Sequence, residues 1–383
     1  GVDVDGVGTG NAATGDDGDV IFASDGTING AGYDLTIDVE NGANDGDIQL
    51  PNQIGNGGDL GILSLTSGSG FIVLGDGTAA TQFDVDNAAG VGNDAISFGS
   101  IVVLTSDTTI NTNGADFDSS NAFITSNAAD NWNLTINTTD GGAGADGDVN
   151  QGDIGDVDSA LGQLADGAVY TYVGDVQITA TDGGGAAGDL YFTDAEASIN
   201  GDDSNHVTTI LEGDYNFNGD NIIANDSYAF QIDTNGDNSG DSGDINLYQS
   251  GTTTISASAA GTSAEMRLNT TSTDGNAGDV TIGTVDDTAQ PNTFLQRVEI
   301  LATGATSNGT VTLNGDINVD RGGAGVNPIF VIAEGDIVLP TSITIDTEQG
   351  DNQFGGYVRL GTNGSNTSSS GSISASANNV ILT

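Results

Sequence analysis

Gly-Asp pairs divide this chain into short stretches of alternating apolar residues, and the pattern constrains the fold more than any other feature. In the stretch VTLNGDINV at 311–319, apolar side chains occupy every second position on both sides of the pair. A period of two predicts strands that bury one face. We expect Asp at the corner because its side chain caps turns, and Gly because a corner often requires a positive φ. The chain is therefore predicted to be all-β.

A longer corner recurs along the whole chain. In MRLNTTSTDGNAGDVTI at 266–282, an apolar–x–apolar triplet is followed by a segment of Gly, Asp, Asn and Thr, and then by a second strand. Nine copies of this arrangement begin at Val2, Leu35, Phe83, Leu134, Val176, Phe230, Met266, Val298 and Ile343. Their starts lie 32 to 54 residues apart, about 43 on average. The sequence is therefore that of a repeat protein.

A unit this short cannot bury its own apolar face, so neighbouring units must stack. We predict a parallel β-helix (a β-solenoid) of about nine degenerate modules of ~43 residues, continuous over 1–383 and part of a longer or polymeric assembly. If each module makes two coils of about 21 residues, the chain winds roughly 18 coils stacked ~4.8 Å apart. An array of β-sandwiches is the alternative, but variation in length at one corner favours a solenoid.

The charge of the chain excludes several kinds of partner. The net charge is −51, from 55 acids against four arginines and no lysine, and only seven of the acids are glutamates. Such a surface repels nucleic acid and anionic lipid, and no apolar run has the ~18 residues that a membrane helix needs. It also repels its own copies unless salt or divalent cations screen it. We therefore expect a salty or calcium-containing, extracellular medium, with an intracellular halophile as the alternative.

One corner has the oxygen spacing of a calcium loop. In DTNGDNSGDSGD, which begins at Asp233, acidic, amide and hydroxyl side chains fall at positions 1, 3, 5, 7, 9 and 12, as in an EF-hand. Gly stands at position 4 instead of 6, and Asp replaces the usual Glu at position 12. The candidate Ca²⁺ ligands are Asp233, Asn235, Asp237, Asp241 and Asp244. The alternative is a solvated turn, because the other copies of the corner do not keep this spacing.

Few residues favour catalysis. His206 is the only histidine, and there is no cysteine. A β-helix enzyme that cleaves acidic polysaccharides would need Lys or Arg to hold the carboxylates of its substrate. We therefore predict that the chain is not an enzyme. Trp132 and the pair Tyr170 and Tyr172 are candidates for stacking on sugars, although a structural role is the simpler interpretation.

The repeated text LTI-[DN]-T, a Gly/Asp-rich corner and VTLNGDI resembles the β-strand repeats of filamentous-haemagglutinin-like large exoproteins. The resemblance runs through all nine copies. It implies a secreted right-handed β-helix that acts as an adhesin or as a fibre shaft. The secretion module of that family carries Asn-Pro-Asn-Gly, and the nearest stretch here is VNPIF at 326–330.

The leading functional hypothesis is an extracellular structural or adhesive β-solenoid that forms a fibre, sheath or adhesin shaft on a microbial cell surface. Its expected partners are further copies of itself, end to end or laterally, and host or surface glycans. One alternative is a calcium-dependent surface-layer or cadherin-like module. A more remote one is a β-helix enzyme that cleaves polysaccharides.

Overall fold

The chain winds through three parallel β-sheets, here called A, B and C, and visits them in the same order in every coil. The computed structural model describes residues 2–3, 18–22, 26–40, 45–86, 94–127, 131–142, 144–155, 170–181, 186–193, 206–224, 229–237, 239–248, 253–258, 264–285, 295–319, 330–347, 357–361, 373–374 and 380–382. Among these residues there is no helix. The residues form two compact units: unit 1 is 1–174, 178–189 and 194–203, and unit 2 is 175–177, 190–193 and 204–383.

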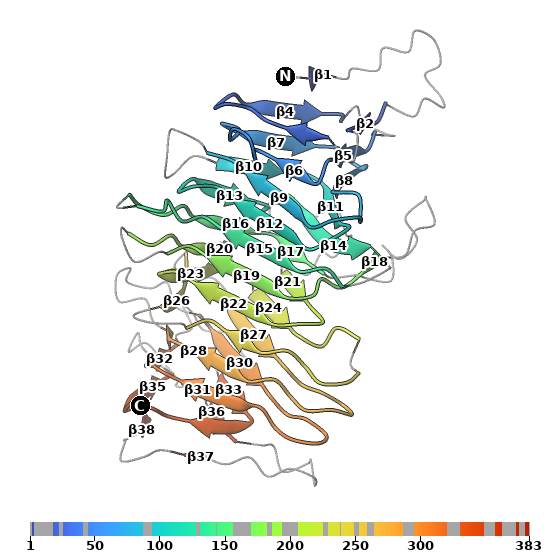
Figure 1. The fold of residues 1–383 in the computed structure, drawn as a ribbon. Helices are drawn as coiled ribbons and strands as arrows, with labels where there is room; N and C mark the ends of the chain where they lie inside the picture. Colours follow the sequence, from blue (N-terminus) through green and yellow to red (C-terminus); the bar gives the residue numbers. More distant parts are fainter. Residues whose placement is uncertain are drawn as a thin grey trace. The chain divides into compact units, whose positions relative to one another are not determined.

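In unit 1 each sheet is a stack of parallel strands that follow one another in sequence order (Figure 1). Sheet A contains β1 (Val2–Asp3), β4 (Leu35–Asp38), β7 (Leu63–Thr66), β10 (Asp94–Phe98), β13 (Asp116–Asp118) and β16 (Val149–Gln151). Sheet B contains β2 (Val20–Ile21), β5 (Ile48–Leu50), β8 (Phe71–Leu74), β11 (Ile101–Leu104), β14 (Phe123–Asn127) and β17 (Asp153–Ile154), and β18 (Tyr170–Thr171) pairs antiparallel with β14. Sheet C contains β3 (Thr27–Ile28), β6 (Gln53–Ile54), β9 (Thr81–Asp84), β12 (Thr108–Asn111) and β15 (Leu134–Asn137).

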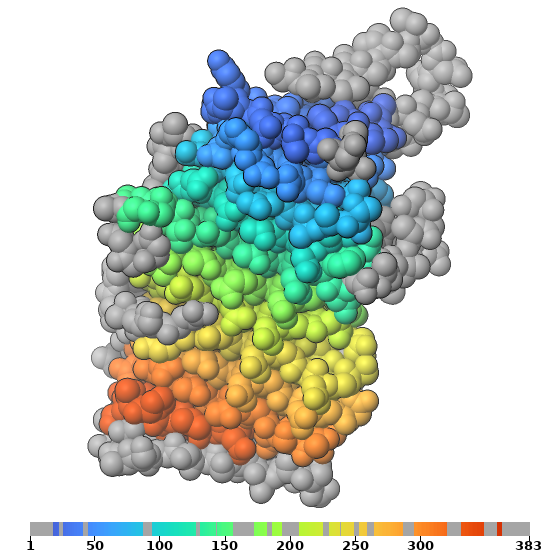
Figure 2. All heavy atoms as spheres, viewed as in Figure 1, coloured from blue at the N-terminus to red at the C-terminus, as the bar shows by residue number. Residues whose placement is uncertain are grey.

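Unit 2 has the same construction, and its successive coils form bands in sequence order in Figure 2. Sheet A contains β20 (Leu190–Phe192), β23 (Asn221–Ala224), β26 (Thr254–Ala257), β29 (Thr284–Val285), β32 (Ile317–Asn318), β35 (Ile343–Asp346) and β38 (Val380–Leu382). Sheet B contains β21 (His206–Ile210), β24 (Ala229–Asp233), β27 (Glu265–Asn269), β30 (Arg297–Leu301), β33 (Phe330–Glu334) and β36 (Tyr357–Leu360). Sheet C contains β19 (Val176–Thr179, whose last two residues belong to unit 1), β22 (Tyr215–Asn218), β25 (Ile245–Asn246), β28 (Val280–Ile282), β31 (Thr310–Leu313), β34 (Asp336–Val338) and β37 (Ile373–Ser374).

In the core, strand register places inward-facing apolar side chains directly above apolar side chains of the coil below. In sheet B of unit 1 one inward column runs through Ile48, Ile72, Val102, Ile124 and Ile154, each at most 1 % exposed. Parallel pairing without shift makes such columns wherever the period-two pattern holds. The stacked columns, together with ring pairs such as Phe192 on Phe230, form a core that is continuous within each unit.

The prediction of a parallel β-solenoid is confirmed, and the parallel strand pairing is incompatible with the antiparallel sheets of a sandwich. The module of ~43 residues made of two coils is wrong. Each coil has three strands, and the separation of partners in neighbouring coils varies: it is 21 residues from Ile96 to Phe117, 37 from Ile345 to Leu382 and 41 from Asp148 to Asp189.

The physical reason for this error is that all three sides use the same local pattern. The nine copies begin in β1, β4 and β35 of sheet A, in β24, β27 and β30 of sheet B, and in β9, β15 and β19 of sheet C. A strand followed by a Gly/Asp corner does not reveal which side of the coil it occupies. Successive copies of the sequence repeat therefore begin one coil, one and two-thirds coils or two coils apart.

Glycine before the corner aspartate is required by close approach of neighbouring coils rather than by φ. A Cβ on Gly243, Gly278 or Gly309 would lie under 3.0 Å from the carbonyl oxygen of the glycine one coil below, closer than real Cβ atoms approach. Gly147 and Gly188 stack in the same way. None of these five glycines has a positive φ. The expectation of positive φ is therefore wrong at these five positions, whereas Gly75 and Gly335, which also precede an Asp, do have positive φ.

Replacement of Gly147 by Ala should destabilise the fold by about 1–3 kcal/mol, because the new methyl group would press on the backbone of Ala115 one coil below. Gly142 in the same corner is a matched control. A Cβ there would meet only the Asp140 carboxylate, at 3.7 Å or more, so Gly142→Ala should leave the free energy of unfolding unchanged or raise it slightly. Urea unfolding of both variants measures the difference. Equal effects would contradict the close-approach explanation.

Candidate functional site

The five predicted calcium ligands lie in one corner of unit 2, between β24 of sheet B and β25 of sheet C. Asp233 is the last residue of β24, and Asp244 immediately precedes β25. The corner is closed by its own polar side chains. The backbone N–H of Asn235 donates to Asp233 Oδ1 at 3.1 Å, and the hydroxyl of Thr234 donates to the carbonyl of Gly243 at 2.7 Å. The segment is therefore a hydrogen-bonded corner of the coil.

The same closure recurs in other coils. At the next corner of unit 2, the N–H of Thr271 donates to Asn269 Oδ1 at 3.2 Å, and the hydroxyl of Thr270 donates to the carbonyl of Gly278 at 2.7 Å. In unit 1, Thr138 and Gly147 make the equivalent bond at 2.6 Å. An Asp or Asn followed by Thr, with Gly closing the loop, is thus the chemical signature of this corner. The signature was present in the sequence as [DN]-T within the repeated text.

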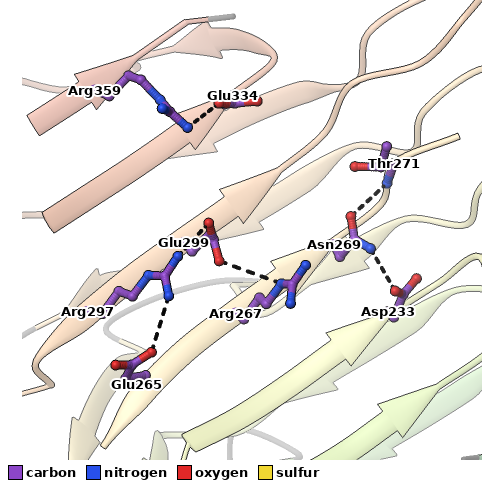
Figure 3. A network of polar contacts seen from close by, with 9 residues as sticks. All are labelled: Asp233, Glu265, Arg267, Asn269, Thr271, Arg297, Glu299, Glu334 and Arg359. Carbon is purple, nitrogen blue, oxygen red and sulfur yellow. Dashed lines mark hydrogen bonds and ion pairs between the residues drawn. The ribbon is translucent and has the colours of Figure 1, made fainter. Parts of the chain in front are cut away.

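Polar side chains also join this corner to the coils on either side. Asn269 Nδ2 donates to Asp233 Oδ2 at 2.6 Å, and Figure 3 shows Asn269 between Asp233 and Thr271. Asn235 is 2 % exposed, and its Nδ2 donates to the carbonyl of Thr271 at 3.0 Å. Its Oδ1 is buried and has no hydrogen-bond partner in the described structure.

The remaining two candidates point to different neighbours. Asp237 accepts hydrogen bonds from the N–H and hydroxyl of Ser239, while its own N–H donates to Glu212 Oε1 of the preceding coil at 2.6 Å. Asp241 accepts two hydrogen bonds from Asn276 of the following coil, at 2.8 and 3.0 Å. Glu212 was not predicted, because it joins this corner only through the stacking of coils.

Within the described part of the chain, no three Asp, Glu or His side chains are grouped so that they could hold a metal ion. The five candidates share a corner, yet their hydrogen bonds direct them to separate backbone and amide groups. Calcium binding here stays a prediction.

The Gly-Asp motif builds columns of carboxylates that run from coil to coil. In unit 2 the column consists of Asp175, Asp214, Asp244 and Asp279, here called the carboxylate column. The Oδ1 of each Asp accepts a hydrogen bond from the backbone N–H of the next member or, for Asp279, of Thr310, at 2.7–2.9 Å. A shorter column in unit 1 joins Asp116, Asp148 and Asp189, with both bonds at 2.9 Å. Charge-assisted bonds of this kind are stronger than neutral ones.

The columns also bring like charges close together. Burial raises the pKa of Asp244, and the charges of Asp214 and Asp279 raise it further, while the bond from the N–H of Asp279 lowers it. Burial likewise raises the pKa of Asp148. The bond from the N–H of Asp189 lowers it, and the charges of Asp116 and Asp189 raise it. Burial also raises the pKa of Asp233. The folded chain therefore tolerates these negative charges rather than being stabilised by them.

The outer face of sheet B in unit 2 carries the arginines that the structure describes. Arg267, Arg297 and Arg359 project from β27, β30 and β36, and Figure 3 shows them alternating with glutamates. Arg297 contacts Glu299 at 2.7 Å and Glu265 at 3.5 Å, and Arg267 contacts Glu299 at 3.6 Å. Arg359 pairs with Glu334. Pairs exposed to this degree stabilise a fold by only ~0–1 kcal/mol each.

The other residues selected from the sequence lie in unit 1 or at the edge of sheet B. Trp132 is half-buried, and its indole Nε1 donates to Asn127 Oδ1 at 2.9 Å, which is a structural contact at the end of β14. Tyr170 lies in β18, Tyr172 follows it, and His206 begins β21. The structure places Trp132 beside the Tyr170 segment, because Asn127 is the strand partner of Tyr170 and the carbonyl of Trp132 accepts a hydrogen bond from the N–H of Gly174 at 2.9 Å. No described contact joins this group to His206. No helix in the described residues is long and apolar enough to cross a membrane.

Comparison with known proteins gives no family for this chain. No protein-family model, no curated protein and no solved structure matches it. The resemblance to haemagglutinin-like exoproteins therefore stays a prediction, and functional argument must start from the columns and the arginine face.

Substitutions at Asp244 separate its role as a hydrogen-bond acceptor from its charge. Asp244→Asn keeps an acceptor for the N–H of Asp279 and removes a charge of raised pKa, so at neutral pH stability should be retained or increased. Asp244→Ala leaves that N–H without its partner and should cost about 1 kcal/mol. Urea unfolding at pH 7 measures both. If Asp244→Asn were as damaging as Asp244→Ala, the negative charge of Asp244 would itself be required for stability. A cation bound to the carboxylate would impose such a requirement.

Acidification should stabilise the fold. Burial raises the pKa of Asp94, Asp148, Asp233, Asp244 and Glu212 above the ordinary values of 3.8 and 4.5, so the folded state binds protons at a higher pH than the unfolded state. Their contribution to stability therefore rises as the pH falls through the raised pKa values, and it is complete below the ordinary ones. Asp241, whose pKa is lowered by Asn276, acts in the opposite direction.

The urea midpoint should accordingly be higher at about pH 4.5 than at about pH 7 at constant ionic strength. The double variant Asp148→Asn/Asp244→Asn should show a smaller difference between the two values. A midpoint that falls on acidification in the wild-type protein would contradict this assignment.

Proposed function

We propose that this chain is a structural, adhesive β-solenoid that forms a fibre, sheath or adhesin shaft on a microbial cell surface. The observation that carries the proposal is the continuity of parallel pairing and side-chain columns from coil to coil within each unit. The described coils are held by backbone ladders and by apolar columns, and many of their corners contain a Gly-Asp pair. Such a winding is quasi-one-dimensional, and its length can grow by further coils without a change of design.

The strands at the edge of such a winding favour self-association. In sheets A, B and C of unit 2, the last strands are β38, β36 and β37. An edge strand presents unpaired N–H and C=O groups to which another strand can add. Parallel pairing with further coils, whether of the same chain or of a second copy, would continue the three sheets and extend the fibre.

The acidic surface suits an extracellular medium that contains salt. With a net charge of −51, copies of the chain repel one another. Because the Debye length is ~8 Å at physiological ionic strength, dissolved salt screens this repulsion and allows copies to approach closely. Adhesion to host or surface glycans belongs to the same proposal, with the outer faces of the sheets as the contact area.

A calcium-dependent surface-layer or cadherin-like module is the second candidate. The observation that favours it is the buried, unpartnered Oδ1 of Asn235 beside Asp233, a carboxylate whose pKa is raised by burial. Carbonyl and carboxylate oxygens are the ligands that calcium prefers. The hydrogen-bonded closure of the same corner favours the structural proposal over this one.

Electron microscopy of the purified protein tests the proposed function. We expect fibres at physiological salt, formed in a concentration-dependent manner, that persist after chelation of divalent cations because protein groups close each corner. Particles that stay monomeric at every concentration in sedimentation would contradict the proposal. Fibres that dissociate on chelation and re-form with calcium would support the calcium-dependent module.

A further inference from the structure

The arginine face of sheet B presents positive charge outward. The side chains of Arg267, Arg297 and Arg359 are 46 %, 29 % and 36 % exposed. Two of their partners lie deeper, since Glu299 is 12 % exposed and Glu334 is 13 % exposed. At Arg267 and Arg359 an approaching group therefore meets a guanidinium group before the paired carboxylate, whereas Glu265 is more exposed than Arg297, at 39 % against 29 %.

This face is exceptional on so acidic a chain. The whole sequence has four arginines and no lysine against 55 acids, and the fourth arginine, Arg321, lies outside the described residues. In the described part of the chain, the outer face of sheet B in unit 2 is thus where an anionic group can approach with favourable charge.

The spacing of the arginines matches the carboxylate column. Arg267 and Arg359 stand in the same row of sheet B, which passes from Arg267 through Glu299 and Ile332 to Arg359. They are therefore three strand spacings apart, about 14 Å. The carboxylate column has four members in successive coils, so Asp175 and Asp279 are also three spacings apart. Asp175, Asp244 and Asp279 are exposed, and the column bonds use only the Oδ1 atoms.

We propose that the arginine face of one copy binds the carboxylate column of a second copy, so that solenoids associate side by side. The inference rests on the proposed function and names the surface through which fibres join laterally. The two surfaces have a common period because both are set by the stacking of coils. A partner with a different repeat could match one arginine, whereas the end members of the column in a second copy match both Arg267 and Arg359, with the two middle members opposite Glu299 and Ile332.

The two surfaces differ, so the contact is heterologous. A heterologous contact that does not close into a ring generates an open array. Each copy would present one face and one column, and side-by-side addition could continue in the plane of a sheath. Charge pairs of this kind set register and orientation as well as affinity.

Neutralisation of the arginines tests one side of the contact. In the variant Arg267→Gln/Arg359→Gln, fibres should still form, but the protein concentration needed for lateral bundles should rise about tenfold or more. The matched control is Thr312→Glu/Thr344→Glu, which has the same net charge and places its new acids on the outer faces of sheets C and A. The control should bundle nearly as the wild-type protein does.

Neutralisation of the carboxylate column tests the other side of the contact. The proposed contact predicts less bundling in such a variant, whereas a general repulsion between copies predicts more. The variant Asp214→Asn/Asp244→Asn/Asp279→Asn keeps every Oδ1 acceptor of the column and makes the chain less negative by three charges. If only net repulsion limited association, this variant would bundle more readily. We expect it to bundle less readily, by a similar factor to the arginine variant.

Negative-stain electron microscopy, with fibre length and fibre width measured separately, distinguishes the outcomes. Wild-type fibres that are always one solenoid wide would overturn the lateral contact and leave the proposed function in place. Column variants that bundle as well as wild type would also overturn it. Absence of fibres of any width would overturn the proposed function and the inference together.

A soluble polyuronate serves as the competing anion. If it binds the wild-type protein and not Arg267→Gln/Arg359→Gln, while wild-type fibres stay single, the face is a glycan site and the lateral contact is overturned. If it merely raises the concentration needed for wild-type bundles, it competes with the carboxylate column, as the proposal requires.

Discussion

Parallel stacking of successive coils at ~4.8 Å is the constraint on which the rest of each unit depends. Because the strands pair in register, a residue on one coil has a residue of the same sheet position above and below it. Each side chain therefore contacts the side chains at the same sheet position in the coils above and below. Apolar residues gain from this, as the column from Ile48 to Ile154 shows. Glycine is needed where backbones meet, since any Cβ on Gly278 would press on Gly243. Aspartate is accepted only because the N–H of the next coil faces its carboxylate.

The preference for Asp over Glu and for Arg over Lys follows from the same stacking. At a corner, the short Asp side chain holds its Oδ1 within 2.7–2.9 Å of the next backbone N–H, a bond that fixes neighbouring corners in register. On the outer face of sheet B, the polar contacts between strands join two side chains instead of a side chain and a backbone N–H. There the longer Glu and the forked guanidinium of Arg can reach across strands, as Arg297 does to Glu265 and Glu299. Each acid is thus matched to the distance that it must span.

The sequence predicted the strands and the solenoid because both depend on local patterns, namely period-two alternation and Gly-Asp corners. It did not predict the coil, because the repeat copies that start in β9, β24 and β35 have the same apolar–x–apolar pattern before a Gly/Asp corner although these strands belong to three different sheets. The five candidate ligands were placed in one corner correctly, since that needs only their nearness in sequence. What each side chain contacts could not be predicted. Glu212, Asn269 and Asn276 meet that corner through coils 25 to 36 residues away, and this separation varies from coil to coil.

Stacking also provides a physical basis for the self-association that we propose for so acidic a chain. A random distribution of 55 acids would repel a second copy from every direction at close range. In this structure a share of the acids is gathered into columns at the corners, where each carboxylate is bonded to a backbone N–H, while the described arginines are gathered on one face. Because acids and arginines lie on different parts of unit 2, its surface has distinct negative and positive regions, each with the repeat spacing of the coils. Because both features inherit their period from the backbone, complementarity between copies needs no separate design: the rule that holds one coil on the next also sets the spacing by which one solenoid can recognise another.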